Sequence, residues 1–237
     1  MGQEIRLTAS DGGRFAAYLA LPAGVSASAP APGLVLLPEV FNTNPHIRSV
    51  ADGYAAEGFV VLAPDVYWRQ EPGCYCAYTD EGRAKAQSLR AQLDTDQFTR
   101  DLGDMFAALR ARPDCTGKVG IMGFCLGGKF AYLSATRLPI DAAVSYYGVE
   151  IDRYLDEADR LRCPLLMHFA QTDPHVPAPT VAAIRARMGG WSDKVAIHQD
   201  YPGSEHGFNR QGYPPYQEAA AKRARERTLA HLRRLLA

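Results

Sequence analysis

Short apolar runs alternate along the chain with segments whose apolar residues recur at helical spacing. The runs 33–38 and 59–64 are apolar and end in proline, which is typical of buried parallel strands. Residues 47–57, which Gly58 terminates, and 95–112 carry apolar side chains on one face and so predict amphipathic helices. The same patterns predict strands at 118–122, 142–148, 164–170 and 194–198, and helices at 129–136, 179–188 and 217–236.

The N-terminal segment has a different pattern. Residues 5–8 and 15–20 alternate between apolar and polar side chains, which predicts an antiparallel hairpin at one edge of a sheet. The strand–helix alternation that follows predicts an α/β fold, a mostly parallel sheet with helices on both faces. No linker, repeat or low-complexity run divides the chain, so residues 1–237 are expected to form a single domain. Functional residues are then expected at the carboxyl ends of the strands.

The composition narrows the function classes. The 26 basic and 26 acidic residues give a net charge of zero, so no electrostatic feature favours nucleic acid or an anionic membrane as a partner. No apolar stretch approaches the roughly 18 residues of a membrane span, and the N-terminus lacks the apolar core of a signal peptide. Five cysteines, an odd number, do not resemble a disulfide framework, and we expect a reducing cytoplasm.

Metal and cofactor motifs are not found in the sequence. Cys74 and Cys76 have the wrong spacing for a zinc pair, and no second pair of ligands lies nearby. The glycine cluster at 123–128 lacks both the G-x-G-x-x-G spacing and the lysine of a P-loop. We therefore expect no metal and no cofactor.

The segment 123–128 carries the strongest chemical signal. It reads Gly-Phe-Cys-Leu-Gly-Gly, the G-x-S-x-G nucleophile elbow of α/β-hydrolases with Cys125 in place of serine. The glycines permit a tight turn from strand to helix, and the start of the helix favours negative charge on the thiol or on an oxyanion. Taken alone, Cys125 is better explained as a small buried apolar residue. The order of the other candidates decides in favour of a nucleophile.

A cysteine nucleophile needs a base and an acid that orients the base. In α/β-hydrolases these follow the nucleophile in the order acid, then histidine. Asp173 follows the predicted strand 164–170, and His206 lies in a glycine-flanked loop after the next strand. Asp173 alone could be a turn residue. His175 competes for the role of base, but its position beside its own acid favours a loop residue, and His168 within a strand favours a core histidine.

The loop after the first predicted parallel strand offers a second acid. Glu39 lies there, either as a functional carboxylate or as a solvated loop residue. The same loop supplies an oxyanion-hole amide in related hydrolases, so we assign the hole to the backbone N–H groups of Val40 and Leu126.

The candidate residues fall in four segments: 37–41, 123–128, 173–177 and 206–210. Together these segments resemble the dienelactone hydrolase family, whose members hydrolyse the enol-lactone carboxymethylenebutenolide during the breakdown of chloroaromatic compounds. The resemblance covers nearly the whole chain, and G-F-C-x-G-G is specific because most other α/β-hydrolases carry serine. It implies an α/β-hydrolase fold and a triad of Cys125, His206 and Asp173. Glu39 matches an extra carboxylate that contacts the resting thiol and helps to activate it.

The resemblance also implies an anionic substrate. Arg83 and Arg210 match two arginines that bind the substrate carboxylate, a role that suits the arginine fork. Phe41 and Tyr147 are assigned to the substrate pocket. The chain departs from the family because no aromatic residue follows Arg83 closely, and Trp68, Tyr75 and Tyr78 are the candidates to supply that surface.

Two other functions stay open from the sequence. A carboxylesterase or thioesterase of broader specificity could use the same triad, and a non-catalytic carboxylate-binding protein could use the same fold. A small anionic lactone or ester is the expected partner, and a monomer is the expected state.

Overall fold

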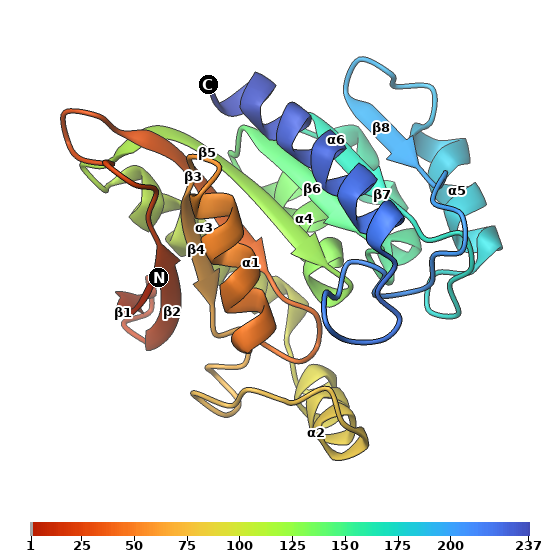
Figure 1. The fold of residues 1–237 in the computed structure, drawn as a ribbon, viewed down its shortest axis with the longest axis horizontal. Coiled ribbons are helices and arrows are strands. Elements are labelled where there is room, and N and C mark those ends of the chain that lie inside the picture. Colours follow the sequence, from red (N-terminus) through yellow and green to blue (C-terminus); the bar gives the residue numbers. More distant parts are fainter. Residues whose placement is uncertain (1) are drawn as a thin grey trace. The chain divides into compact units, whose positions relative to one another are not determined.

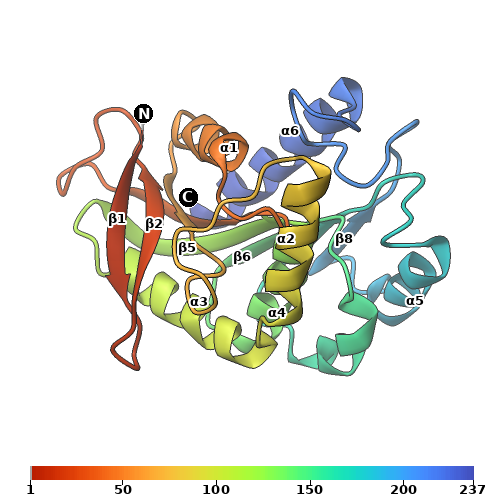
Figure 2. The ribbon, with the colours of Figure 1, turned by 90° about the horizontal axis from the view of Figure 1, so that it is seen from below.

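The computed structural model describes residues 2–237. They form two compact units, one up to Gly120 and one from Ile121, and strand β5 (Cys115–Phe124) runs from the first into the second. Within each unit, strands form a layer with helices packed against it (Figures 1 and 2). The sheet is mostly parallel, as the alternation of strands and helices predicts.

The first unit contains the predicted hairpin and parallel strands. Its elements are β1 (Gln3–Thr8), β2 (Arg14–Ala20), β3 (Ala31–Leu37), α1 (Pro45–Ala55), β4 (Val60–Pro64), α2 (Asp80–Ala91), α3 (Thr95–Arg110) and the start of β5. The strand order is β1-β2-β4-β3-β5. β1 and β2 pair antiparallel at the edge, and β3 runs parallel to β4, with Gly33 opposite Val60. Helices α1 and α3 cover opposite faces of these strands (Figure 2).

The second unit carries the predicted elbow. Its elements are the end of β5, α4 (Leu126–Arg137), β6 (Ala142–Tyr146), the 3-10 segment η1 (Ile151–Arg160), β7 (Leu165–His168), α5 (Ala178–Met188), β8 (Val195–His198) and α6 (Glu218–Leu236). The strand order is β5-β6-β7-β8. β6, β7 and β8 are parallel, and Tyr146, His168 and His198 lie side by side at their carboxyl ends. Helices α4 and α6 lie on opposite faces of β6 (Figures 1 and 2).

The predicted helices have recognisable start signals and one buried face. Helix α3 begins after Asp94, whose carboxylate accepts hydrogen bonds from the N–H groups of Asp96 and Gln97, both at 2.9 Å. Its apolar stripe is buried as the spacing predicts: Phe98, Leu102, Met105, Phe106 and Leu109. Helix α4 differs because its residues from Leu126 to Thr136 are all buried, so an amphipathic pattern could not define its ends.

Two helical segments, α2 and η1, were not predicted. Helix α2 buries only Ala86 and Leu89 and is strongly polar, so it shows almost no apolar periodicity. Its start signal was nevertheless present, because the Thr79 hydroxyl accepts the N–H of Gly82 at 3.1 Å and two acidic residues follow. Segment η1 is 3-10 rather than α-helical, and its Tyr154 departs from helical backbone angles.

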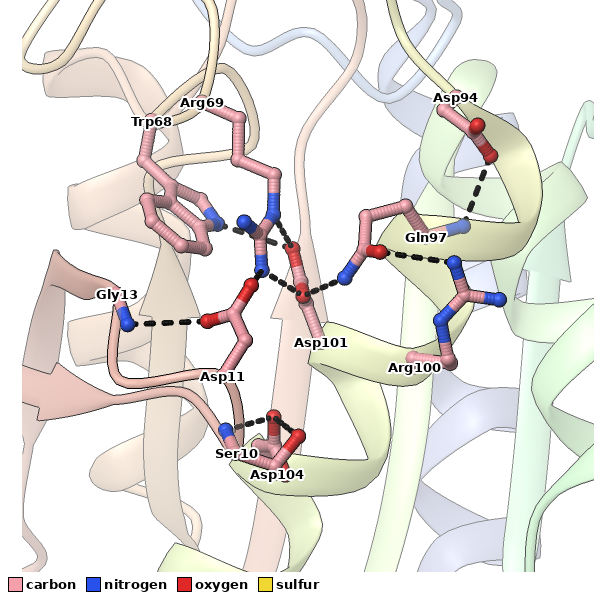
Figure 3. A network of polar contacts seen from close by, with 10 residues as sticks. All are labelled: Ser10, Asp11, Gly13, Trp68, Arg69, Asp94, Gln97, Arg100, Asp101 and Asp104. Atoms are coloured by element: carbon pink, nitrogen blue, oxygen red, sulfur yellow. Dashed lines mark hydrogen bonds and ion pairs between the residues drawn. The ribbon is translucent and has the colours of Figure 1, made fainter.

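A polar network around Asp101 joins three segments of the first unit (Figure 3). The Asp101 carboxylate, 1% exposed, accepts hydrogen bonds from Trp68 Nε1 at 3.2 Å, from Arg69 Nε and Nη2 at 2.9 and 2.7 Å, and from Gln97 at 3.0 Å. Arg69 also pairs with Asp11 at 2.8 Å. Trp68, proposed above as pocket surface, is thus committed to this network, and its ring stacks on Phe15.

We expect Asp101→Asn to lower the free energy of unfolding by about 2–3 kcal/mol, because a buried carboxylate that balances Arg69 becomes neutral. Urea denaturation measures this change. Asp104→Asn is the matched control on the same helix, since Asp104 only accepts hydrogen bonds from Ser10 at a more exposed position. The control should cost less than about 1 kcal/mol. Equal losses in the two variants would contradict a central role for Asp101.

Candidate active site

Cys125 stands at a sharp turn between β5 and α4, as the elbow motif predicts. Its φ of 54° and ψ of −110° are rare for a residue with a side chain and mark a strained position. Hydrogen bonds hold the turn: the Cys125 N–H donates to the Tyr146 carbonyl at 2.9 Å, and its carbonyl accepts from Lys129 at 3.2 Å and Val149 at 3.3 Å. The backbone of β6 and the loop after it therefore fix the elbow.

The glycines of the motif are required by close backbone approach. A Cβ on Gly123 would collide with the backbone of Gly127, and one on Gly128 would lie 2.7 Å from the Cα of Gly148. Helix α4 can therefore begin directly after Cys125, at Leu126. The first N–H groups of a helix have no acceptor within the helix, and the helix dipole adds partial positive charge there. The N–H of Leu126 is thus available to an oxyanion beside the thiol.

His206 and Asp173 form a hydrogen-bonded pair. His206 Nδ1 lies 2.8 Å and 3.0 Å from the two carboxylate oxygens, and both side chains are almost entirely buried. Asp173 Oδ1 also accepts the backbone N–H groups of His175 at 2.8 Å and Val176 at 3.0 Å. Burial alone would raise the pKa of Asp173, but the hydrogen bonds from His206 and from these two N–H groups outweigh it and lower that pKa. Asp173 is thus held ionised.

Cys125 is the second electrostatic partner of His206. The other ring nitrogen, Nε2, is buried and makes no hydrogen bond of regular geometry within residues 2–237. Burial favours the neutral ring, but a negative charge on Cys125 and the Asp173 carboxylate together raise the pKa of His206 to about 10. The ring therefore takes up a proton readily when the thiol loses one. An acid, a histidine and a thiol in this relation can perform nucleophilic catalysis.

Aromatic rings surround His206. Tyr147 lies 4.8 Å from the His206 ring, centroid to centroid, and 5.4 Å from Phe208. Tyr147 is buried, has a positive φ of 38° and donates its N–H to the His168 carbonyl at 2.7 Å, so its backbone is held in a rare conformation beside the catalytic candidates. The exposed His175 packs edge-on against His206 at 4.7 Å. Sequence reasoning placed His175 in a loop, correctly, but missed this contact.

Arg210 belongs to the same loop as His206. It is 7% exposed, and its Nη1 donates to the Pro214 carbonyl at 3.2 Å. Gly207 has a φ of 91°, a conformation that favours glycine, and a Cβ there would lie 3.0 Å from Arg210 Nη2. The guanidinium thus lies against the residue that follows His206.

His168, predicted to be a core histidine, is one. It is fully buried, with Nδ1 at 2.6 Å from the Tyr201 hydroxyl and Nε2 at 3.0 Å from the Thr228 hydroxyl. Burial lowers the pKa of His168 well below its ordinary value, so the ring is neutral.

The other predicted residues lie in the first unit. The exposed Arg83, on α2, places its guanidinium 5.7 Å from the centre of the buried Phe41 ring, and Tyr78 packs edge-on against Phe41 at 4.6 Å. Glu39 is 3% exposed, which excludes the solvated-loop alternative. The Val40 carbonyl accepts the Tyr67 hydroxyl at 2.9 Å.

Asn42 fixes the loop after β3 that contains Glu39 and Val40, a role that the sequence did not predict. It is fully buried, with a φ of 63°. Its amide nitrogen donates to Asp65 and to the Cys74 carbonyl, and its amide oxygen accepts the N–H groups of Thr43 and Val66. All four hydrogen-bonding positions of the side chain are thus used, and they tie together the loops that follow β3 and β4.

Among residues 2–237, no group of three or more histidine, cysteine, aspartate or glutamate side chains is arranged to hold a metal ion. In the same part of the chain, no helix combines the length and the apolar character that crossing a membrane requires.

The fold and the elbow define an α/β-hydrolase. A crystal structure of a candidate dienelactone hydrolase from Klebsiella pneumoniae superimposes with a TM-score of 0.85 at 27% sequence identity, over 98% of each chain.

The family model described as "Dienelactone hydrolase family" matches residues 15–236. A candidate carboxymethylenebutenolidase of Azospirillum brasilense is 37% identical over 235 residues, which cover 98% of this chain and 99% of that protein. The carboxymethylenebutenolidase of Pseudomonas putida is 34% identical over 229 residues, which cover 96% and 94%. The chain belongs to the dienelactone hydrolase family, and it is a hydrolase of lactones or esters.

Proposed function

We propose that this protein hydrolyses the enol-lactone carboxymethylenebutenolide to maleylacetate through a thioester on Cys125. The observation that carries the proposal is the buried His206–Asp173 pair, which responds electrostatically to a thiol on a strained strand-to-helix turn. Two relatives that share about a third of their residues with this chain bear the name of that activity. The roles of the individual residues belong to the proposal.

The reaction proceeds in two halves. In the first, His206 accepts the thiol proton, and the sulfur of Cys125 attacks the lactone carbonyl to form a carbon–sulfur bond. The N–H of Leu126 and, as the second predicted donor, that of Val40 stabilise the oxyanion, and loss of one such donor typically costs about 10²–10³ in rate. The ring carbon–oxygen bond then breaks. The oxygen leaves as an enolate, which takes up on carbon the proton that His206 received from the thiol, so the ketone forms and His206 is neutral again.

In the second half, water attacks the thioester carbonyl. His206 takes a proton from the water and gives it to the sulfur as the carbon–sulfur bond breaks, so the thiol is restored, and the product acid loses its own proton to solvent and leaves as a carboxylate. Asp173 keeps the Nδ1–H of His206 directed at itself, so that Nε2 faces the reacting groups. The enolate is a good leaving group, which suits a thiol nucleophile.

An arginine fork is proposed to bind the substrate carboxylate. Arg210 supplies it beside His206, with Gly207 leaving room for the guanidinium. The predicted roles of Glu39, Phe41, Arg83 and Tyr147 rest on the match to the family: Glu39 helps to activate the thiol, Arg83 binds the carboxylate, and the two aromatic residues shape the pocket.

The experiment compares a charged lactone with a neutral ester. Arg210→Gln and Arg83→Gln should each raise KM for dienelactone about 10- to 100-fold, because a charge-assisted hydrogen bond contributes about 1.5–3 kcal/mol. KM for p-nitrophenyl acetate, which has no carboxylate, should stay unchanged. Arg185→Ala is the matched control, since Arg185 is an exposed arginine of the same unit as Arg210 that donates to the Ile197 carbonyl.

The outcomes separate the alternatives. Turnover of p-nitrophenyl acetate without turnover of dienelactone would contradict the lactone assignment and identify a broader esterase. Alkylation of Cys125 without turnover of either substrate would identify a carboxylate-binding protein. Melting curves of Arg210→Gln accompany the kinetics, because that arginine is buried.

The cellular setting is also proposed from the family. The lactone arises during degradation of aromatic, including haloaromatic, compounds, and the enzyme acts on it in the cytoplasm as a monomer without a cofactor.

A further inference from the structure

The site depends on two loops of the second unit that come from different strands. Asp173 lies beyond the end of β7, and His206 lies beyond the end of β8. The strands are in register up to His168 and His198, and a bond from Phe169 N–H to the His198 carbonyl at 2.8 Å continues their ladder by one step. Past that point the sheet no longer holds the two loops together. A separate set of contacts must keep His206 against Asp173.

Ser204 supplies two of those contacts. Its side chain is fully buried, and its hydroxyl donates to the Tyr201 carbonyl at 2.6 Å. The same hydroxyl accepts the N–H of Gln171 at 2.9 Å, and the Ser204 carbonyl accepts the N–H of Thr172 at 3.0 Å. These two donors are the residues that precede Asp173 directly. Ser204 itself precedes His206 by two positions. The hydrogen bonds of Ser204 to Gln171 and Thr172, here called the clamp, therefore lie beside both Asp173 and His206.

Gln171 adds a further bond between the two loops. Gln171 Oε1 accepts the N–H of Gly203 at 2.7 Å, so Gln171 contacts the His206 loop both through its backbone and through its side chain. Tyr201, which receives the Ser204 hydroxyl, stacks on Phe208 with ring centres 5.3 Å apart. Phe208 in turn packs against Tyr147. The clamp is therefore connected, through Tyr201 and Phe208, to the Tyr147 ring that packs against His206.

We propose that Ser204 is a positioning residue, whose hydroxyl fastens the Asp173 loop to the His206 loop and so sets the Asp173–His206 hydrogen bond. The inference rests on the proposed function for its consequence in catalysis. Ser204 touches neither substrate nor reacting atoms. Its effect passes through the geometry of the pair, which tolerates little displacement, because a shift of about 1 Å in a catalytic group can cost about 10²-fold in rate.

Ser204→Ala removes one oxygen from a fully buried position. The backbone bond from Thr172 to residue 204 stays, and the Tyr201 carbonyl keeps the Ser204 N–H as a donor at 3.1 Å, but the Gln171 N–H loses its partner. The chain should therefore fold, with a modest loss of stability and with looser loops. Ser134→Ala is the matched control, because Ser134 is also fully buried and its hydroxyl makes no hydrogen bond within residues 2–237.

The test measures kcat, KM and the titration of the His206 ring by nuclear magnetic resonance. For Ser204→Ala we expect kcat for p-nitrophenyl acetate to fall at least about 10-fold with KM unchanged. We also expect the pKa of His206 to fall, because a longer hydrogen bond to Asp173 favours the charged ring less. Ser204→Thr keeps the hydroxyl and should recover most of kcat, while Ser134→Ala should match the unsubstituted protein in both readouts.

Two results would overturn the proposal. One is a Ser204→Ala variant whose kcat and His206 titration equal those of Ser134→Ala. The other is a Ser204→Ala variant that melts earlier and turns over more slowly but keeps the His206 titration of the unsubstituted protein. That result would show that Ser204 contributes only to stability. The titration needs no substrate. Absence of turnover in the unsubstituted protein would therefore refute the proposed function without deciding the role of Ser204.

Discussion

Replacement of Cys125 by alanine is expected to lower kcat for dienelactone and for p-nitrophenyl acetate by about 10⁴-fold or more, because no other group forms the acyl intermediate. The fold should be retained. Cys125 is only partly buried, and the turn is held by backbone bonds from Tyr146, Lys129 and Val149 that the substitution leaves in place. Steady-state kinetics measure the loss, and thermal melting checks the fold.

Cys163→Ala is the control for that experiment. Cys163 is buried, and burial raises the pKa of its thiol to about 12, so it is unreactive and its loss should leave turnover unchanged. The kcat of Cys125→Ser should lie between those of Cys125→Ala and Cys163→Ala, because the neighbours of Cys125 are arranged for sulfur. Activity retained in Cys125→Ala would remove Cys125 from the mechanism.

Asp173→Asn is expected to lower kcat by about 10⁴-fold through the wrong histidine tautomer. The backbone N–H groups of His175 and Val176 require an acceptor at Oδ1, so the amide oxygen occupies that position. The amide NH₂ then faces Nδ1 of His206 and forces the ring proton onto Nε2. A protonated Nε2 cannot accept the thiol proton. Asp156→Asn, an exposed aspartate of the same unit, is the control and should be unchanged.

The same substitution should alter stability in a definite range of pH. Once the thiol proton has passed to His206, the charges of Cys125 and Asp173 raise the pKa of that ring from its ordinary 6.5 to about 10, so this ion pair with protonated His206 stabilises the folded state. That contribution is complete below about pH 6.5 and is lost as the pH rises towards 10. Asp173 supplies part of the shift. The difference in unfolding free energy between the unsubstituted protein and Asp173→Asn should therefore shrink from pH 6.5 to pH 10, and a difference that grows would contradict this ion pair.

The fold could be predicted wherever buried positions appear in the sequence as apolar runs or as regularly spaced apolar residues. β4 is buried along its length and β3 from Gly33 onward, both are followed or ended by a proline, and α3 buries a stripe at helical spacing. Helix α2 buries only Ala86 and Leu89, so its periodicity is absent, and only the Thr79 cap could have indicated it. The division of the chain within β5 follows from how contacts are distributed in three dimensions, which local patterns do not record.

The candidate site was predictable where chemistry restricts the residue type. Cys125, Asp173 and His206 stand in an order and a loop context that few other functions require. The contact of His175 with His206 and the proposed role of Ser204 were not predicted, because both depend on which loops meet beyond the ends of β7 and β8. No spacing in the sequence places Ser204 against Gln171, or the ring of His175 against that of His206.

The most direct test of the thioester mechanism is rapid-quench mass spectrometry with p-nitrophenyl acetate in excess. The account predicts an acetyl group on the peptide that contains Cys125, formed in the same time range as the burst of nitrophenol. It also predicts that the adduct decays as turnover proceeds, and that Cys125→Ala carries none. An adduct on any other residue, or turnover through the burst phase with no adduct on Cys125, would contradict it.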